Sequence, residues 1–195
     1  LVDVAIGKNI VFEDDGPAVS PTTASKSLDD EGLPGGISAA GIGDVAGENT
    51  TVSGTLNFSA GEDGLKSIAL SGPATLGTEA VTSKWDADTQ TLTISSLGRG
   101  ELVTIKLTNM ATGAYTATLL KPLMHDAGDD ENDFSLNVGY TVTDGDKDTA
   151  EGTLTINIDD DVPTIQASGL ATESFVTYQS TDAGYHNSYG YYVKG

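Results

Sequence analysis

The sequence predicts an all-β protein whose strands pack as an antiparallel β-sandwich, and three observations lead to that prediction. Apolar residues recur at every second position in several separate segments, which is the period of a half-buried strand. Threonine fills many of the alternating polar positions, and β-branched residues of this kind favour strands. Turn-forming stretches rich in Gly and Asp separate these segments, and no segment has a helical period.

The expected strands follow one another along the chain. The first covers 52–58, and two more lie at 91–94 and 103–107, each with Thr on its polar face. The longest run is 134–142, with alternating apolar residues throughout, and the last covers 153–158. Turn signals separate them at 61–64, 71–73, 97–100 and 144–146. Short strands spaced in this way are typical of a sandwich, so the expected fold class is an Ig- or cadherin-like antiparallel β-sandwich with long Gly/Asp-rich loops.

The amino-acid composition argues against several classes of binding partner and site. The 195 residues include 9 Lys and Arg against 29 Asp and Glu, which gives a net charge of −20. Such a surface argues against binding nucleic acid, because phosphate neutralisation needs a basic face, and against docking on anionic lipid. No apolar run is long enough to cross a bilayer as a helix, so direct membrane insertion is not expected. Cysteine is absent, which excludes disulfides and thiolate metal sites.

The acidic residues are clustered, and this clustering predicts calcium binding. Calcium takes about six to eight hard oxygen ligands, which carboxylates and carbonyls supply. Neighbouring carboxylates repel one another, and a divalent ion removes that repulsion; the alternative is that these acidic turns are simply solvated. The long Gly- and acid-rich segment 21–49 adds another cluster and is expected to be a loop. The candidate ligands are Asp14, Asp15, Asp129, Asp130, Asp144, Asp146, Asp148, Asp159, Asp160 and Asp161.

Other site chemistries fit the sequence poorly. The spacing Asp144, Asp146, Asp148 is not an EF-hand loop, because Thr149 and Thr155 occupy the places of its Gly and Glu. The two histidines lie in separate segments, so a zinc site is not expected, and His125 is interpreted as a polar turn residue. No Gly-x-Ser-x-Gly elbow is present, and the sequence predicts a protein that is not an enzyme.

Two segments near opposite ends of the chain share one pattern. In 12–19 and in 158–165, an apolar residue is followed by three acids, one residue, Pro, one residue and a second apolar residue. This is expected when one unit of a tandem array is cut from a longer chain with both of its joints. We therefore expect a linker and joint at 1–19 and a calcium-dependent sandwich domain at 20–163. Residues 164–195 are expected to form a linker and the Tyr-rich start of a following domain, or a packed extension.

Several of these segments together resemble the repeat domain of giant type I secreted repeats-in-toxin (RTX) adhesins of Gram-negative bacteria. The resemblance is carried by 13–17, 52–56, 61–64, 140–146 and 158–163. It implies a secreted domain at the bacterial cell surface that binds Ca²⁺, contacts neighbouring domains of its own chain and extends ligand-binding modules for adhesion or biofilm formation. The tail from 174 to 191 is similar to the opening of another domain found near the ligand-binding region of these adhesins. The glycine-rich nonapeptide repeats of RTX proteins are absent, so no β-roll is expected.

Two functions follow as alternatives. In the first, calcium at the domain joints would stiffen an extender domain outside the cell, where the ion is abundant, while glycan or peptide ligands bind to adjacent modules. In the second, this domain would itself be a calcium-dependent carbohydrate- or peptide-binding module, with the tail tyrosines beside the ion.

Overall fold

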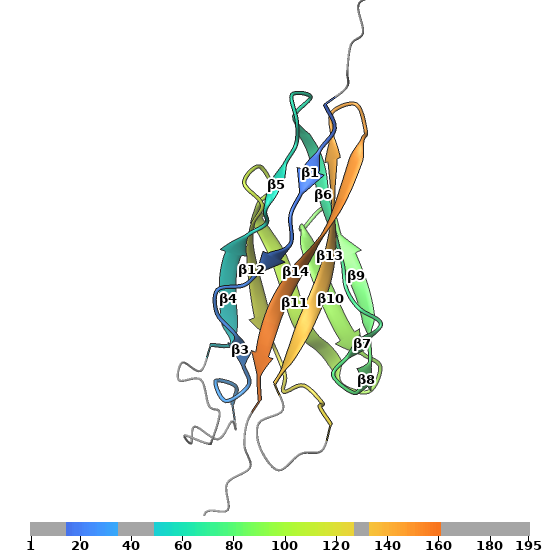
Figure 1. The fold of residues 1–195 in the computed structure, drawn as a ribbon. Helices are drawn as coiled ribbons and strands as arrows, with labels where there is room; N and C mark the ends of the chain where they lie inside the picture. The colour runs from blue at the N-terminus through green and yellow to red at the C-terminus, as the bar shows by residue number, and fades with distance from the viewer. Residues whose placement is uncertain (1–14, 35–48, 127–132, 161–195) are drawn as a thin grey trace, which may run out of the picture. The chain divides into compact units, whose positions relative to one another are not determined.

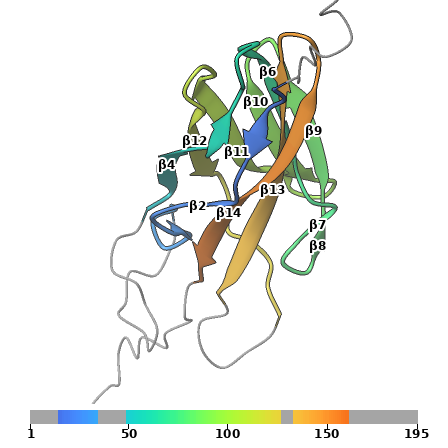
Figure 2. The ribbon, with the colours of Figure 1, turned by 45° about the horizontal axis from the view of Figure 1, so that its top comes forward.

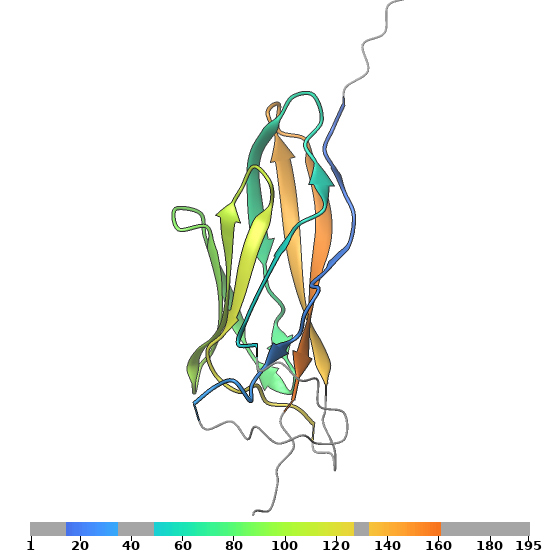
Figure 3. The same ribbon diagram turned by 90° about the vertical axis from the view of Figure 1, so that its left-hand side faces the viewer.

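A computed structural model describes residues 15–34, 49–126 and 133–160, and these residues form a β-sandwich (Figure 1). The described residues contain strands and turns but no helix. Two five-stranded sheets pack face to face, as the edge-on view in Figure 3 shows. The predicted fold class is therefore confirmed.

The first sheet is antiparallel throughout. Its strand order is β4 (Thr51–Thr55), β12 (Ala114–Leu119), β11 (Gly100–Asn109), β10 (Thr91–Ser96) and β9 (Thr82–Asp86). Threonines line up across its outer face, because the pairing register aligns Thr51, Thr118, Thr104 and Thr93 on four neighbouring strands. The polar half of the period-two pattern thus faces solvent, as expected.

The second sheet is built around one long hairpin. β13 (Phe134–Asp144) pairs with β14 (Thr149–Asp159) over almost their whole length, and β6 (Leu65–Ser71) flanks β13. On the other side, β2 (Thr22–Thr23) and β3 (Leu28–Asp29) both pair with β14 in parallel (Figure 2). These two parallel pairings are the departure from an otherwise antiparallel sandwich.

Two small ladders complete the described strands. β1 (Ala18–Val19) pairs with β5 (Phe58–Ser59), and β7 (Thr75–Leu76) forms a hairpin with β8 (Glu79–Ala80). β1 lies within the segment expected to be a preceding joint, so part of that segment lies along the sandwich.

Several expected boundaries were wrong. The single strand expected at 52–58 is two strands, because the chain turns at Leu56, whose N–H donates to the carbonyl of Gly113. The alternating pattern continues across this turn, since Leu56 stays buried and hides the break. The loop expected at 21–49 contains β2 and β3, and β6, β9 and β12 were not predicted.

The core lies between the two sheets. Leu92, Ile94 and Ile105 from the first sheet and Leu136, Val138, Leu154 and Ile156 from the second have no exposed surface. Burying aliphatic side chains of this size contributes about 1.5–3 kcal/mol each. The sandwich is therefore held by hydrophobic packing between its sheets, which leaves the acidic residues to the strand ends and turns.

Two buried tyrosines each cover a glycine on the neighbouring strand. Tyr115 lies opposite Gly54, and Tyr140 lies opposite Gly152; in both cases a Cβ on the glycine would overlap the tyrosine ring. The Tyr140 hydroxyl donates to the carbonyl of Ser20 at 2.8 Å and lies 3.1 Å from that of Asn57. The Tyr115 hydroxyl is buried and has no hydrogen-bond partner among the described residues. Tyr140 thus ties the N-terminal segment to the second sheet.

The different hydrogen bonding of the two tyrosine hydroxyls gives a test of how the N-terminal segment is held. We expect Tyr140→Phe to lower the free energy of unfolding by about 1 kcal/mol, because it removes the hydroxyl that ties Ser20 to the sheet. Tyr115→Phe is the matched control and should be neutral or stabilising, because it removes a buried hydroxyl without a partner. Urea denaturation of both variants measures the effects. Equal destabilisation by the two substitutions would contradict the assigned role of Tyr140.

Candidate metal centre

The turn between β13 and β14 has a tightly closed backbone. Asp144 ends β13, and its N–H donates to the carbonyl of Asp148 at 3.1 Å. Lys147 has a φ of 92°, a left-handed conformation that a residue with a side chain seldom adopts. The loop therefore holds a specific shape in which residues 144, 146 and 148 come close together.

The Asp144 carboxylate uses its two oxygens differently. Oδ1 accepts from the N–H groups of Lys147 at 3.0 Å and Asp148 at 2.7 Å, and these bonds shape the loop. Oδ2 is buried and has no hydrogen-bond partner among the described residues. The residue as a whole has no exposed surface. A buried carboxylate oxygen without a donor is costly, and a bound cation is one way to offset that cost.

Two further carboxylates lie beside Asp144. One oxygen from each of Asp144, Asp146 and Asp148 lies within 4.8 Å of the others, and Asp146 and Asp148 are exposed. Calcium–oxygen distances are about 2.3–2.6 Å, so two oxygens on one ion lie at most about 5 Å apart. The three oxygens are therefore spaced closely enough to share a single divalent ion.

The electrostatics of the metal-free loop are unfavourable. Burial raises the pKa of the Asp144 carboxyl, and the Asp146 carboxyl beside it raises that pKa further. The N–H groups of Asp148 and Lys147 act in the opposite direction but do not cancel the increase. The folded state thus disfavours the charged form of Asp144 unless a cation is present.

Two other chain segments meet this turn. Asp15, the first described residue, accepts through Oδ2 from the N–H of Glu62 at 3.2 Å. A Cβ on Gly16 would lie 3.6 Å from Oδ2 of Asp148, and a Cβ on Gly145 would overlap the carbonyl of Asp63. The β5–β6 turn and the entering segment therefore lie directly against the three-carboxylate loop. Asp15, predicted as a ligand, is nearby but is not one of the three clustered carboxylates.

The other end of β14 carries a second group of acids. Asp159 is aligned with Asp29 in the parallel pairing, and both are buried together with Asp30 and Asp160. Nε2 of His125 lies 3.1 Å from Oδ1 of Asp160, so the histidine that was expected to be a polar turn residue forms an ion pair when protonated. Asp159 and Asp160 thus lie at the opposite end of the hairpin from Asp144.

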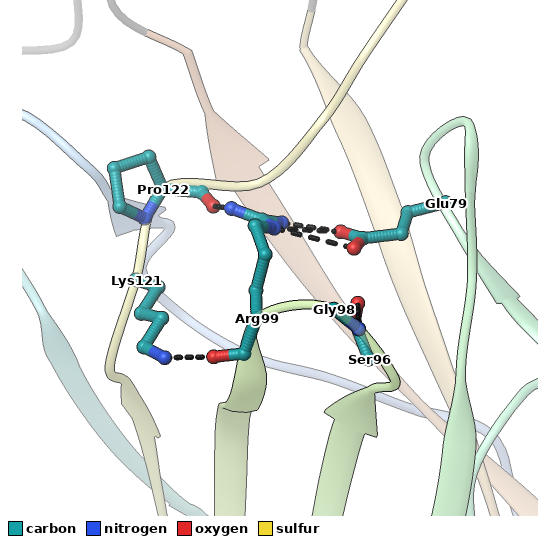
Figure 4. Close-up of polar contacts among 6 residues, drawn as sticks. All are labelled: Glu79, Ser96, Gly98, Arg99, Lys121 and Pro122. Carbon is teal, nitrogen blue, oxygen red and sulfur yellow. Dashed lines mark hydrogen bonds and ion pairs between the residues drawn. The ribbon is translucent and has the colours of Figure 1, made fainter.

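A third polar cluster, around Arg99, is structural (Figure 4). The Arg99 guanidinium binds both carboxylate oxygens of Glu79 and donates to the carbonyl of Pro122 at 2.7 Å. Its own carbonyl accepts from Lys121. Hydrogen bonds from Arg99 and from Ser96 hold the pKa of Glu79 below its usual range. The cluster fixes the β7–β8 hairpin to the β10–β11 turn and leaves no carboxylate oxygen unsatisfied there for a metal.

Among the described residues, the structure thus groups three of the predicted ligands, leaves Asp15 beside them and places Asp159 and Asp160 at the other end of β14. Sequence reasoning missed the meeting of Asp29 with Asp159, because a strand as short as the two-residue β3 leaves no periodic signal. Four predicted ligands lie outside the described residues, and these are Asp14, Asp129, Asp130 and Asp161.

Comparisons with protein-family models, with curated proteins and with solved structures found no match to this chain. Within the described ranges there is also no helix long and apolar enough to cross a membrane.

The buried carboxylate predicts an unusual effect of one substitution. Asp144→Asn should raise the free energy of unfolding in EDTA at pH 7, because it removes a charge that the fold disfavours while keeping the oxygen that accepts from the loop N–H groups. A raised folded-state pKa stabilises the fold below the unfolded value, and that stability is lost as the pH rises through the folded value. The advantage of the variant should therefore shrink between pH 7 and pH 4 in urea denaturation. A variant less stable than the parent at pH 7 would contradict this account.

Proposed function

We propose that this chain is a calcium-binding scaffold domain of a bacterial surface adhesin of the RTX type. The role is non-catalytic: the domain extends and stiffens the adhesin outside the cell. The observation that supports calcium binding is the buried Oδ2 of Asp144, which has no hydrogen-bond partner in the described part of the chain and belongs to a carboxylate grouped with those of Asp146 and Asp148. The adhesin assignment depends on the resemblance described above.

The chemistry of the loop favours calcium over other divalent ions. All three clustered ligands are carboxylate oxygens, which suit hard cations, and the described residues contribute no nitrogen or sulfur to the group. Two of the carboxylates are exposed, so water and backbone carbonyls can complete the shell. Calcium accepts such irregular shells, whereas magnesium requires a near-octahedral one and loses its water reluctantly.

The place of the loop in the fold supports a structural role for the ion. The loop joins the two longest strands and lies against the segment through which the chain enters the sandwich. An ion there would remove the repulsion among the three carboxylates and hold the turn, β13 and the entering segment together. Extracellular modules bind calcium with Kd of about 10⁻⁴–10⁻³ M, so such a site is empty in the cytosol and filled outside the cell. Its partners would be the neighbouring domains of the same chain, with glycans or peptides bound by adjacent modules.

Thermal unfolding tests the proposal. Calcium at 100 times its Kd adds about 2.7 kcal/mol for one site, which corresponds to a rise in Tm of roughly 5–10 °C for a domain of this size. We expect this rise in millimolar calcium relative to EDTA, with a much smaller effect of magnesium. Absence of a calcium-specific rise would overturn the calcium proposal.

Matched variants locate the site. Asp146→Asn and Asp148→Asn should each remove most of the calcium-dependent rise in Tm, because each removes one of the clustered ligands. Asp88→Asn removes one acid from the β9–β10 turn, away from the clustered loop, and should leave the rise unchanged. If Asp88→Asn reduces the rise as much as the loop variants do, the effect comes from net charge rather than from a specific site.

A further inference from the structure

Two strands of the N-terminal segment, β2 and β3, run beside β14, the last described strand, in the same direction. β2 aligns Thr22 with Leu154, and β3 aligns Leu28 with Ile158. Between these pairings, the N–H of Ala24 donates to the carbonyl of Thr155 at 2.8 Å. The N-terminal segment therefore follows the C-terminal half of β14, and Leu28 anchors it with a side chain that has no exposed surface.

The chain enters and leaves the sandwich at opposite ends. The entering residues Asp15 and Gly16 lie at the β13–β14 turn, while Asp160 directly follows the far end of β14 (Figure 1). β14 has 11 residues. At about 3.3 Å per residue, a strand of that length separates the two ends by more than 30 Å. Tension applied through the two flanking segments would therefore pull along the strand axis.

We infer that this domain is built to carry tension between its two ends, with the parallel pairing of β2 and β3 to β14 as its mechanical clamp. When parallel terminal strands are pulled from opposite ends, they slide past one another. Every hydrogen bond between them is then loaded at once, and all must break together. Pulling both strands from the same end opens the pairs one at a time, and each step needs little force. The hydroxyl of Tyr140 adds a further tie on the N-terminal segment, at Ser20.

The inference depends on the strand pairing and not on the calcium site. The proposed function adds a source of tension, because an extender domain transmits the pull between a cell and the surface it adheres to. The clamp and the calcium site can therefore fail independently of each other.

Single-molecule pulling of the full chain in two directions tests the clamp. In one arrangement the handles are attached at the two chain ends. In the other, one handle stays at the N-terminus and the second is attached at Glu62→Cys, an exposed position in the β5–β6 turn, at the end where the chain enters. The chain contains no natural cysteine, so this attachment is unique. Forced unfolding reports the unfolding barrier, and we expect a rupture force at least about twofold higher for end-to-end pulling at the same loading rate. Equal forces in the two directions, or a lower end-to-end force, would overturn the inference.

A matched pair of proline variants tests the bonds themselves. Ala24→Pro removes the N–H that donates to Thr155 and should lower the end-to-end rupture force towards that of the second arrangement. Ala111→Pro is the control, because Ala111 is an exposed second residue of the turn closed by the bond from Gly113 to Met110, where Pro is well tolerated. If Ala24→Pro does not fold, the comparison of the two pulling directions in the chain that keeps Ala24 still decides.

Both directions are measured in EDTA and in millimolar calcium. A directional difference that persists in EDTA supports the clamp whatever the ion does. A calcium-dependent Tm without a directional difference leaves the proposed calcium site intact and removes the clamp. A directional difference without any calcium effect on Tm supports the clamp and overturns the proposed calcium site.

Discussion

The structure depends on keeping charge away from the two packed sheets. With a net charge of −20, the chain must keep its carboxylates out of the core between the sheets, and most of those in the described residues lie at strand ends and in turns. The outer faces are largely neutral instead, as the aligned row of threonines on the first sheet illustrates. The cost appears at the ends of β14, where Asp144 precedes the strand and Asp159 and Asp160 end it, all buried. Buried carboxylates require partners, so the ends of this sandwich are where bound cations or basic side chains have the largest effect.

The β13–β14 hairpin connects the two acidic ends. It has the longest continuous pairing in the described residues, and its apolar side chains supply much of the core from the second sheet. Neutralising the three-carboxylate turn would therefore stabilise the element on which β2, β3 and β6 are assembled. At the far end, Nε2 of His125 lies 3.1 Å from Oδ1 of Asp160, so this acid has a histidine as a side-chain partner.

The strands and contacts that depend on neighbouring residues in the chain could be predicted from local sequence patterns. The alternation in β13 and β14 continues over many residues, so their existence followed from the sequence, and so did the closeness of Asp144, Asp146 and Asp148 within one turn. The burial of Asp144 also has a signal in the sequence, because the residue continues the alternation of β13 and lies on the same buried face as Tyr140 and Val142. The alignment of Asp29 with Asp159 could not be predicted, because it depends on the register of a parallel pair only two residues long. β12 could have been predicted from the sequence, because its buried residues Tyr115, Ala117 and Leu119 alternate as clearly as the apolar residues of the predicted strands.

The three-carboxylate loop and the parallel pairing of β2 and β3 with β14 would both be loaded when the two ends of the domain are pulled. Tension on the entering segment first reaches Asp15 and Gly16, which lie against the β5–β6 turn and the three-carboxylate loop. It then passes along the N-terminal segment to the bonds with β14, and leaves through the same strand. Without a cation, repulsion among the three carboxylates would weaken the contacts between the loop and the entering segment. An ion at Asp144, Asp146 and Asp148 would hold the loop in place while the parallel bonds share the load, so the two features would act on the same pull at different points.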